Sequence, residues 1–240
     1  MTGASSGIGR AACELFLARG LAVVGLDREE PAAPAGTDRW ASVVGDVTDP
    51  AANAIAADLA AERFGGIDVA VLNAGMPIPG GLDDADLALV ERGFAVNVHG
   101  VVLGLRATLP GLRRSDSAAV VVTGSITGSG GDPVRWAYAA AKAAVKNIVR
   151  SAACAHAPEN VRVNAVVPGP VDSPMVQRIR EGEPEHYRAI AELVPMRRWA
   201  RPDEVAAVIG FLASPEASYV TGALVPVDGG ASAMSGNWRP

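Results

Sequence analysis

Short apolar, β-branched runs recur along the chain, and longer stretches with helical periodicity separate them. The runs predict strands at 21–27, 40–47, 68–75, 118–125, 161–169 and 223–230. The stretches between them predict helices at 7–19, 50–64, 86–109, 137–157 and 202–213. Apolar strands that alternate with helices are typical of a parallel sheet covered on both faces. We therefore predict a single α/β domain over 1–240, with a helical substrate lid at about 170–200, where prolines and mixed charges interrupt the pattern.

The carboxyl ends of the predicted strands differ chemically from the strand interiors. They carry small or polar residues, namely Asp27, Asp46, Asn73-Ala74-Gly75, Gly124-Ser125 and Pro168-Gly169. In open parallel sheets, ligands bind outside the carboxyl ends of the strands. The pattern therefore predicts the location of a binding site before any motif is considered.

Composition narrows the class of protein. The formal net charge of −5 argues against nucleic acid and against an anionic membrane surface as partners. No apolar run reaches the length of a membrane span, and the chain lacks the pattern of a secretory signal, so we expect a soluble cytoplasmic protein. The two cysteines, Cys13 and Cys154, fall in helical segments and are expected to be reduced and buried. The three histidines are scattered, so no metal site is expected.

A glycine-rich loop opens the chain. Gly3, Gly7 and Gly9 have the spacing G-x-x-x-G-x-G, and a helical pattern follows at once. Glycines let a backbone approach a ligand closely, and a helix N-terminus offers free N–H groups to a pyrophosphate. An ordinary glycine-rich turn is the alternative. Asp27, at the end of the next predicted strand, favours the dinucleotide site, because an acidic residue there can bond the adenosine ribose.

The ordered motifs resemble those of the short-chain dehydrogenase/reductase family. They are "TGASSGIG" at 2–9, "NAG" at 73–75, "NVHG" at 97–100, Ser125 and "YAAAK" at 138–142, and the similarity continues to "YVTGALVPVDGG" at 219–230. YxxxK alone is a weak signal, but the ordered set is specific. The resemblance implies a Rossmann-type doubly wound sheet and an oxidoreductase that uses a nicotinamide cofactor.

The resemblance also implies catalytic roles for Ser125, Tyr138, Lys142 and Asn97. Tyr138 and Lys142 are four residues apart and share a helix face. A free tyrosine has a pKa of about 10, and a nearby ammonium should lower it enough for proton transfer. Ser125 would hold the reacting oxygen, and Asn97 would support a water that links the lysine to solvent. Each residue also has a purely structural interpretation, but the ordered set argues against it.

The expected cofactor contacts lie along the same strand ends. They are Gly3, Ser5, Ser6, Gly7, Ile8 and Gly9 for the phosphates, Asp27 for the ribose, Asp46 and Val47 for the adenine, Asn73, Ala74 and Gly75 beside the adenosine, Tyr138 and Lys142 for the nicotinamide ribose, and Pro168, Gly169, Val171 and Ser173 for the nicotinamide. Asp27 should repel a 2′-phosphate, which favours NAD over NADP. Arg28 follows it and could pair with a phosphate, so NADP stays open.

The sequence says less about the substrate than about the cofactor. Preference for NAD suggests oxidation of a secondary alcohol, such as a sugar, polyol or hydroxy acid, whereas similarity to carrier-protein ketoacyl reductases suggests reduction with NADPH. A non-catalytic NAD-binding protein is a third hypothesis. Trp136 and Met76 are expected in the substrate pocket; Arg135 could bind a carboxylate or be a solvated surface residue. The resemblance suggests a homodimer or homotetramer built on the 86–109 and 137–157 helices.

Family members usually carry an apolar strand before the glycine loop, and here only Met1 and Thr2 stand in front of it. A late start of the chain is one explanation, and a genuine start is the other. With a shortened first strand, the two neighbouring strands in the middle of the sheet must either close the gap or leave it open, with unpaired backbone groups along it.

Overall fold

The computed structural model describes residues 1–32 and 37–234. Its strands all pair in parallel: β1 (Val23–Asp27), β2 (Trp40–Val44), β3 (Val69–Leu72), β4 (Ala118–Thr123), β5 (Val161–Pro168) and β6 (Leu224–Val227). Each coincides with a predicted strand but is shorter by one to several residues, because the chain leaves the ladder where the loops begin. The prediction of an α/β fold with a parallel sheet is confirmed.

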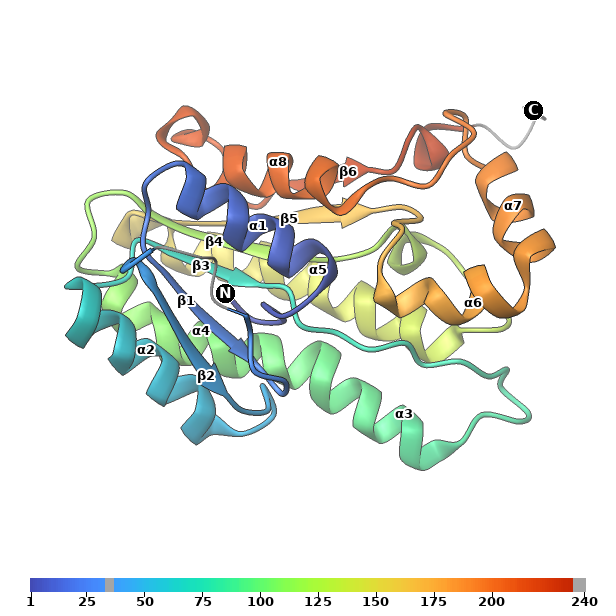
Figure 1. Ribbon diagram of the computed structural model, residues 1–240, viewed down its shortest axis with the longest axis horizontal. Helices are drawn as coiled ribbons and strands as arrows, with labels where there is room; N and C mark the ends of the chain where they lie inside the picture. Colours follow the sequence, from blue (N-terminus) through green and yellow to red (C-terminus); the bar gives the residue numbers. More distant parts are fainter. Residues whose placement is uncertain (33–36, 235–240) are drawn as a thin grey trace.

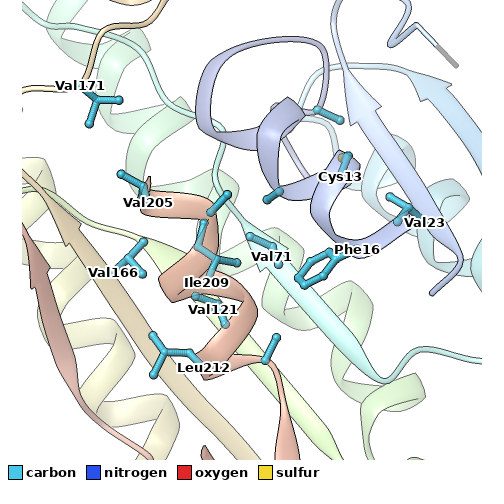
Figure 2. Close-up of a cluster of buried hydrophobic side chains, with 14 of the residues drawn as sticks. Cys13, Phe16, Val23, Val71, Val121, Val166, Val171, Val205, Ile209 and Leu212 are labelled. Atoms are coloured by element: carbon cyan, nitrogen blue, oxygen red, sulfur yellow. The ribbon is translucent and has the colours of Figure 1, made fainter. Parts of the chain in front are cut away.

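Helices cover both faces of the sheet (Figure 1). On one face lie α1 (Gly7–Ala18) and α8 (Pro202–Leu212), and on the other lie α2 (Pro50–Phe64), α4 (Gly100–Leu112) and α5 (Trp136–His156). The strands serve both layers because successive side chains point to opposite faces. Val71 and Val121 pack against α1 and α8 around Phe16 and Ile209, as Figure 2 shows. The alternate residues of β3 and β4 pack instead against α4 and α5.

The remaining elements are short. A helix α3 (Leu87–Phe94) continues through a π-helical turn (Ala95–His99) into α4. The 170–200 segment contains α6 (Gln177–Gly182) and α7 (Pro184–Glu192), and its role as a substrate lid stays a prediction. Single 3₁₀ turns occur at Ile126–Ser129, Ala157–Glu159, Pro174–Val176, Pro215–Ala217 and Ala231–Ala233.

The continuous helical stretch Leu87–Leu112 is notably apolar. Its 26 residues include an 18-residue window with a mean hydropathy of 1.3, which by length and composition alone would suffice to cross a membrane. No single apolar run in the sequence shows this, since small and polar residues interrupt it. In the fold it is a sheet-covering helix: Val101 and Leu105 are buried against β3 and β4, while Val102 is exposed. The expected absence of a membrane partner stays a prediction.

The sheet is divided between β1 and β3. One part has the order β1-β2 and the other the order β3-β4-β5-β6; among residues 1–32 and 37–234, only Thr2 bridges them, in parallel to Leu26 and to Leu72. Leu26 donates its N–H to Met1 O at 2.8 Å, and the Met1 nitrogen donates to Val24 O at 3.0 Å. The described part of the chain therefore fills only the carboxyl-side end of the space between these two strands.

A cavity of about 280 Å³ occupies the rest of this space. Its walls include Val24 of β1, Val69 and Val71 of β3, and residues of α2 and α4. In a parallel ladder alternate residues bond to opposite neighbours, so Val24 N–H and Val71 N–H point into the cavity rather than toward β2 or β4. The predicted gap in the middle of the sheet is present.

The expectation for the cysteines is half right. Both are free; Cys13 is buried, and its burial raises the pKa of the thiol to about 11. Cys154 is exposed, which contradicts the prediction, because its position on α5 points away from β5.

Candidate active site

The glycine loop joins the bridge at Thr2 to the start of α1. Gly3 and Gly7 have φ of +66° and +51°, values that L side chains rarely adopt. A Cβ on Gly9 would lie 1.8 Å from Gly3 O, so this close turn admits no side chain. Ser6 is the N-cap of α1 but makes no side-chain cap bond, and the first turn has no acidic residue. The N–H groups of this turn are therefore left for an external acceptor, and Ile8 packs against the core beneath them.

Asp27 is held against the glycine loop. Its Oδ2 accepts hydrogen bonds from the Ser5 N–H at 3.0 Å and from the Ser5 hydroxyl. Its Oδ1 accepts from the Arg28 N–H at 2.7 Å. Within the described residues the Arg28 side chain makes no ion pair with this carboxylate. The end of β1 thus presents an uncompensated negative charge beside the loop.

Asn73 braces the loop from the other side. Its amide nitrogen donates to Thr2 O and Gly3 O, both at 3.3 Å, and its Oδ1 accepts from the Thr123 hydroxyl at 3.0 Å. The Thr2 hydroxyl accepts from the N–H groups of Asn73 and Ala74. The Asn73 side chain therefore joins β3, β4 and the loop to one another, and the two residues that follow it remain the part of this segment that can face a cofactor.

Asp46 follows β2 and is already engaged within the protein. Oδ1 accepts from the N–H and the hydroxyl of Thr48 at 2.9 and 2.7 Å, and Arg92 on α3 pairs with Oδ2. Burial alone would raise the pKa of Asp46, but the bonds from Thr48 and Arg92 outweigh it and lower the pKa. Val47, beside it, is buried with Leu26. An adenine that contacts the Asp46 carboxylate would therefore share its oxygens with Thr48 and Arg92.

Ser125, Tyr138 and Lys142 converge at the carboxyl end of β4. Ser125 comes two residues after this strand, and its Oγ accepts from the Thr127 N–H at 3.2 Å. This leaves the hydroxyl proton of Ser125 free, and the hydroxyl lies close enough to the Tyr138 hydroxyl to act on its pKa. Lys142 lies one helical turn further along α5, with its Nζ 5.7 Å from the centre of the Tyr138 ring and 3.0 Å from Thr123 O.

The protonation equilibria of this group correct one expectation. Burial raises the pKa of Tyr138, and the Ser125 bond and the charge of Arg135 oppose this only in part. Burial also lowers the pKa of Lys142 to about 8. The predicted net lowering of the tyrosine pKa by the lysine is wrong for the ligand-free protein, because both groups are removed from water and desolvation is the larger effect.

Asn97 lies in the π-helical turn between α3 and α4 and is 1% exposed. Its Oδ1 accepts from Met76 N–H at 3.1 Å and its amide donates to Met76 O at 2.9 Å. A Cβ on Gly75 would lie 2.8 Å from Asn97 Oδ1 and 3.5 Å from Lys142 Nζ. The fold thus brings Asn97 beside the lysine, but its side chain bonds the backbone of Met76. π-Helical turns are frequent at functional sites.

The segment after β5 closes the site. Gly169 N–H donates to Val227 O at 3.1 Å, and a Cβ there would lie 2.9 Å from Asp228 Cα. Val171 is buried and bridges to Ala200. The Ser173 Cβ is 3.3 Å from the position that a Cβ on Gly7 would take, so this segment faces the glycine loop. Pro168, the last residue of β5, is buried at the base.

Four residues of the site were not found from the sequence. They are Thr2, Thr48, Arg92 and Thr123. The spacing Asp46-x-Thr48 is a signal for a local Asx-type turn that could have identified Thr48. Arg92 and Thr123 are 46 and 50 residues away in sequence from their hydrogen-bond partners, and no local sequence pattern predicts such contacts.

The expected substrate-pocket residues are only partly together. Trp136 lines a cavity of about 830 Å³ with Gly81, Leu82, Asp83, Asp84 and residues 131–133, but Met76 and 170–200 are outside it. Trp136 Nε1 donates to Gly81 O at 3.1 Å. Arg135 is exposed and paired with Asp132 at 2.9 Å, as the alternative of a surface residue predicts. Among the described residues no cluster of His, Cys, Asp and Glu could hold a metal ion.

The residues of this edge fit a dinucleotide. The uncapped N-terminus of α1 and the side-chain-free turn at Gly9 suit an anionic pyrophosphate. Asp27 at the end of β1 suits a ribose hydroxyl. The hydroxyls of Ser125 and Tyr138, with the buried ammonium of Lys142, suit an alcohol or carbonyl oxygen beside the nicotinamide.

Known proteins share this sequence and fold. A family model described as enoyl-(acyl carrier protein) reductase matches residues 3–232. Cis-4-hydroxycyclohexanecarboxylate dehydrogenase from Sinomonas cyclohexanicum is 42% identical, over 98% of this chain and 96% of that protein. Ligand-free aldohexose dehydrogenase from Thermoplasma acidophilum has a TM-score of 0.91 at 32% identity, over 100% of this chain and 95% of that one. An NADPH-bound short chain oxidoreductase from Pseudomonas aeruginosa PAO1, containing an atypical catalytic center, has a TM-score of 0.89 at 32% identity, over 98% and 96% of the two chains.

The chain belongs to the short-chain dehydrogenase/reductase family. It is an oxidoreductase that acts on CH–OH groups, and the family implies a nicotinamide cofactor. The resemblance in sequence motifs and the prediction of a Rossmann-type fold are thereby confirmed.

Proposed function

We propose that the protein is an NAD-dependent dehydrogenase that oxidises a secondary alcohol to a ketone through Ser125, Tyr138 and Lys142. The observation that carries the proposal is the convergence of these three side chains at the end of β4, with the glycine loop and Asp27 at the same edge of the sheet. The relative that oxidises a ring hydroxyl and the sugar dehydrogenase support a substrate whose hydroxyl is on a ring or a polyhydroxy chain.

Three side chains of the protein have separate roles in the proposed reaction. Ser125 donates its proton to the substrate oxygen and fixes its position. Tyr138 accepts the hydroxyl proton as the C–O bond becomes a carbonyl, so that it acts as the general base. The Lys142 ammonium stabilises the phenolate that this requires. The nicotinamide cofactor, when bound, supplies the hydride acceptor and a second positive charge near the phenolate.

The preference for NAD rests on Asp27. Its carboxylate is fixed by Ser5 and lies beside no compensating cation among the described residues, so a 2′-phosphate would meet a negative charge. A free 2′-hydroxyl would instead find an acceptor. The NADPH-bound neighbour shows that the same fold also accommodates the phosphorylated cofactor, and Arg28 is the side chain that would serve it here.

Two alternative functions can be weighed against specific observations. The description of the matching family model and the NADPH-bound neighbour favour a reductase, such as one acting on a carrier-linked ketone. A non-catalytic nucleotide-binding role is disfavoured by the intact Ser125–Tyr138–Lys142 group.

The test is a panel of cyclic and acyclic secondary alcohols and the matching ketones, assayed in both directions with NAD and NADP. The proposal requires alcohol-dependent formation of NADH, a higher kcat/KM with NAD, and its loss in Tyr138→Phe. Activity with NADPH and acyl-thioester ketones alone would establish the reductase instead. Binding of NAD without turnover of any substrate would favour the nucleotide-binding role.

We also propose that the enzyme is a cytoplasmic homodimer or homotetramer built on α4 and α5, whose outer faces carry small and apolar residues such as Val102. Sedimentation velocity at micromolar concentration tests the assembly, and an active monomer would refute it.

A further inference from the structure

Asp172 lies where the segment after β5 meets the lid. Its N–H donates to Ala200 O at 2.9 Å, and the Ala200 N–H donates to Pro170 O at 2.9 Å, so the two ends of the lid are joined. The next residue, Ser173, faces Gly7 of the glycine loop. Asp172 is therefore adjacent both to the expected cofactor site and to the base of the lid.

The Asp172 carboxylate contacts both lid helices. Arg180 on α6 donates to Oδ1 at 2.9 Å. The Tyr187 hydroxyl on α7 lies near the same carboxylate, and burial and the charge of Asp172 raise the pKa of Tyr187. The Asp172 carboxylate is thus bonded to α6 and lies beside α7, on the segment that faces the glycine loop.

Tyr187 is also fixed by Trp199. The two rings stack with their centroids 4.4 Å apart and an interplanar angle of 4°. Trp199 Nε1 donates to Tyr187 O at 2.9 Å, and Trp199 is 9% exposed. Because Trp199 directly precedes Ala200, which accepts a bond from the Asp172 N–H, these contacts connect α7 back to Asp172.

The lid helices have little other attachment. No residue of α7 is buried, so the helix gains almost nothing from core packing. Figure 1 shows α6 and α7 beyond the carboxyl ends of β5 and β6, away from the two main helical layers. The end of the lid is tied separately, by the bond from Met196 N–H to Gly229 O. The position of α6 and α7 consequently depends on polar and aromatic contacts, namely the Arg180–Asp172 ion pair for α6 and the stack on Trp199 for α7.

We propose that Asp172 is a positioning residue that, with Tyr187 and Trp199, latches the lid to the segment facing the glycine loop, so that the cofactor side of the site sets the position of the lid over the substrate. Its effect on substrate binding rests on the proposed function, whereas the latch itself does not. A lid held in this way differs from one held by general packing, because removal of the charge of the partly exposed Asp172 side chain should loosen it.

The test compares Asp172→Asn with the wild type by amide hydrogen exchange across α6 and α7. The variant keeps the side-chain shape and removes the charge. We expect exchange in these helices to accelerate about three- to fivefold, the factor that corresponds to loss of a partly exposed ion pair. The substrate KM should rise by a similar factor, with kcat changed much less. Tyr187→Phe keeps the stacking on Trp199 and should accelerate exchange in α7 more than in α6.

Glu159→Gln is the matched control. Glu159 also accepts a two-bond contact from an arginine, Arg113, at 3.0 and 3.1 Å, but on the surface far along the chain from the lid. This variant should leave lid exchange and KM unchanged. Equal lid exchange in Asp172→Asn and the wild type would overturn the latch, as would acceleration spread evenly over the whole chain. Calorimetry with NAD and NADP on the same samples separates the questions: absence of binding refutes the proposed function, while the exchange rates still decide the latch.

Discussion

Replacing Lys142 by methionine should stabilise the cofactor-free protein while it abolishes turnover. Lys142 is 4% exposed, and its only hydrogen-bond acceptor among the described residues is Thr123 O. Burial lowers its pKa from 10.5 to about 8, which corresponds to about 3–4 kcal/mol at about 1.4 kcal/mol per pH unit. Loss of the bond to Thr123 costs about 1 kcal/mol. A methionine of similar length should therefore raise the free energy of unfolding at pH 7 by about 2–3 kcal/mol, or Tm by roughly 5–10 °C.

The pH dependence has a definite sign. Because the folded-state pKa lies below the unfolded value, the unfolded chain binds more protons between about pH 8 and 10.5. The wild type should gain stability as pH rises through this window, and Lys142→Met should not. The advantage of the variant is therefore complete below pH 8 and shrinks above it.

Urea unfolding followed by circular dichroism between pH 6 and 9.5 measures this difference directly. Arg106→Met, which removes one exposed positive charge from α4, is the control and should show no such dependence. The reasoning is refuted if Lys142→Met is less stable than the wild type at pH 7, or if the difference between them is the same at pH 6 and pH 9.5.

The remaining predictions concern the site and the sheet. Tyr138→Phe should lower kcat by about 10²–10⁴-fold with little change in NAD affinity, measured by steady-state kinetics and calorimetry; retained turnover would disprove the general-base role. Asp27→Ala should weaken NAD binding and narrow the ratio of kcat/KM between NAD and NADP, and an unchanged ratio would remove Asp27 from cofactor choice. Gly9→Ala should abolish cofactor binding, because its Cβ would lie 1.8 Å from Gly3 O. Extending the chain before Met1 by four alternating apolar residues should raise the free energy of unfolding by about 2 kcal/mol, since the N–H groups of Val24 and Val71 would gain hydrogen-bond partners. An extension that contains proline is the control, and an equal rise in its Tm by calorimetry would contradict this prediction.

Much of the fold could be predicted because its signals are local. Each strand is a short apolar run that ends in polar residues, and each helix has a periodic apolar face, so their order follows from neighbouring residues alone. The glycine loop is recognisable from a motif of seven residues. Tyr138 and Lys142 lie one helical turn apart, so their proximity is independent of the rest of the chain. The expectation of a gap beside Thr2 came instead from the resemblance to a family whose members carry an apolar strand before the glycine loop.

Only the tertiary structure decided which partners these residues have and how strongly water is excluded from them. The Asp46 carboxylate, an expected adenine contact, is paired with Arg92, and Asn73 bonds both Thr2 and Thr123. Both sets of contacts join distant parts of the chain. The pKa values of Tyr138 and Lys142 move in the directions that burial dictates, which the spacing of the two residues does not reveal. Spacing along one element fixes which side chains share a face, whereas desolvation and long-range hydrogen bonds depend on how the separate elements pack together.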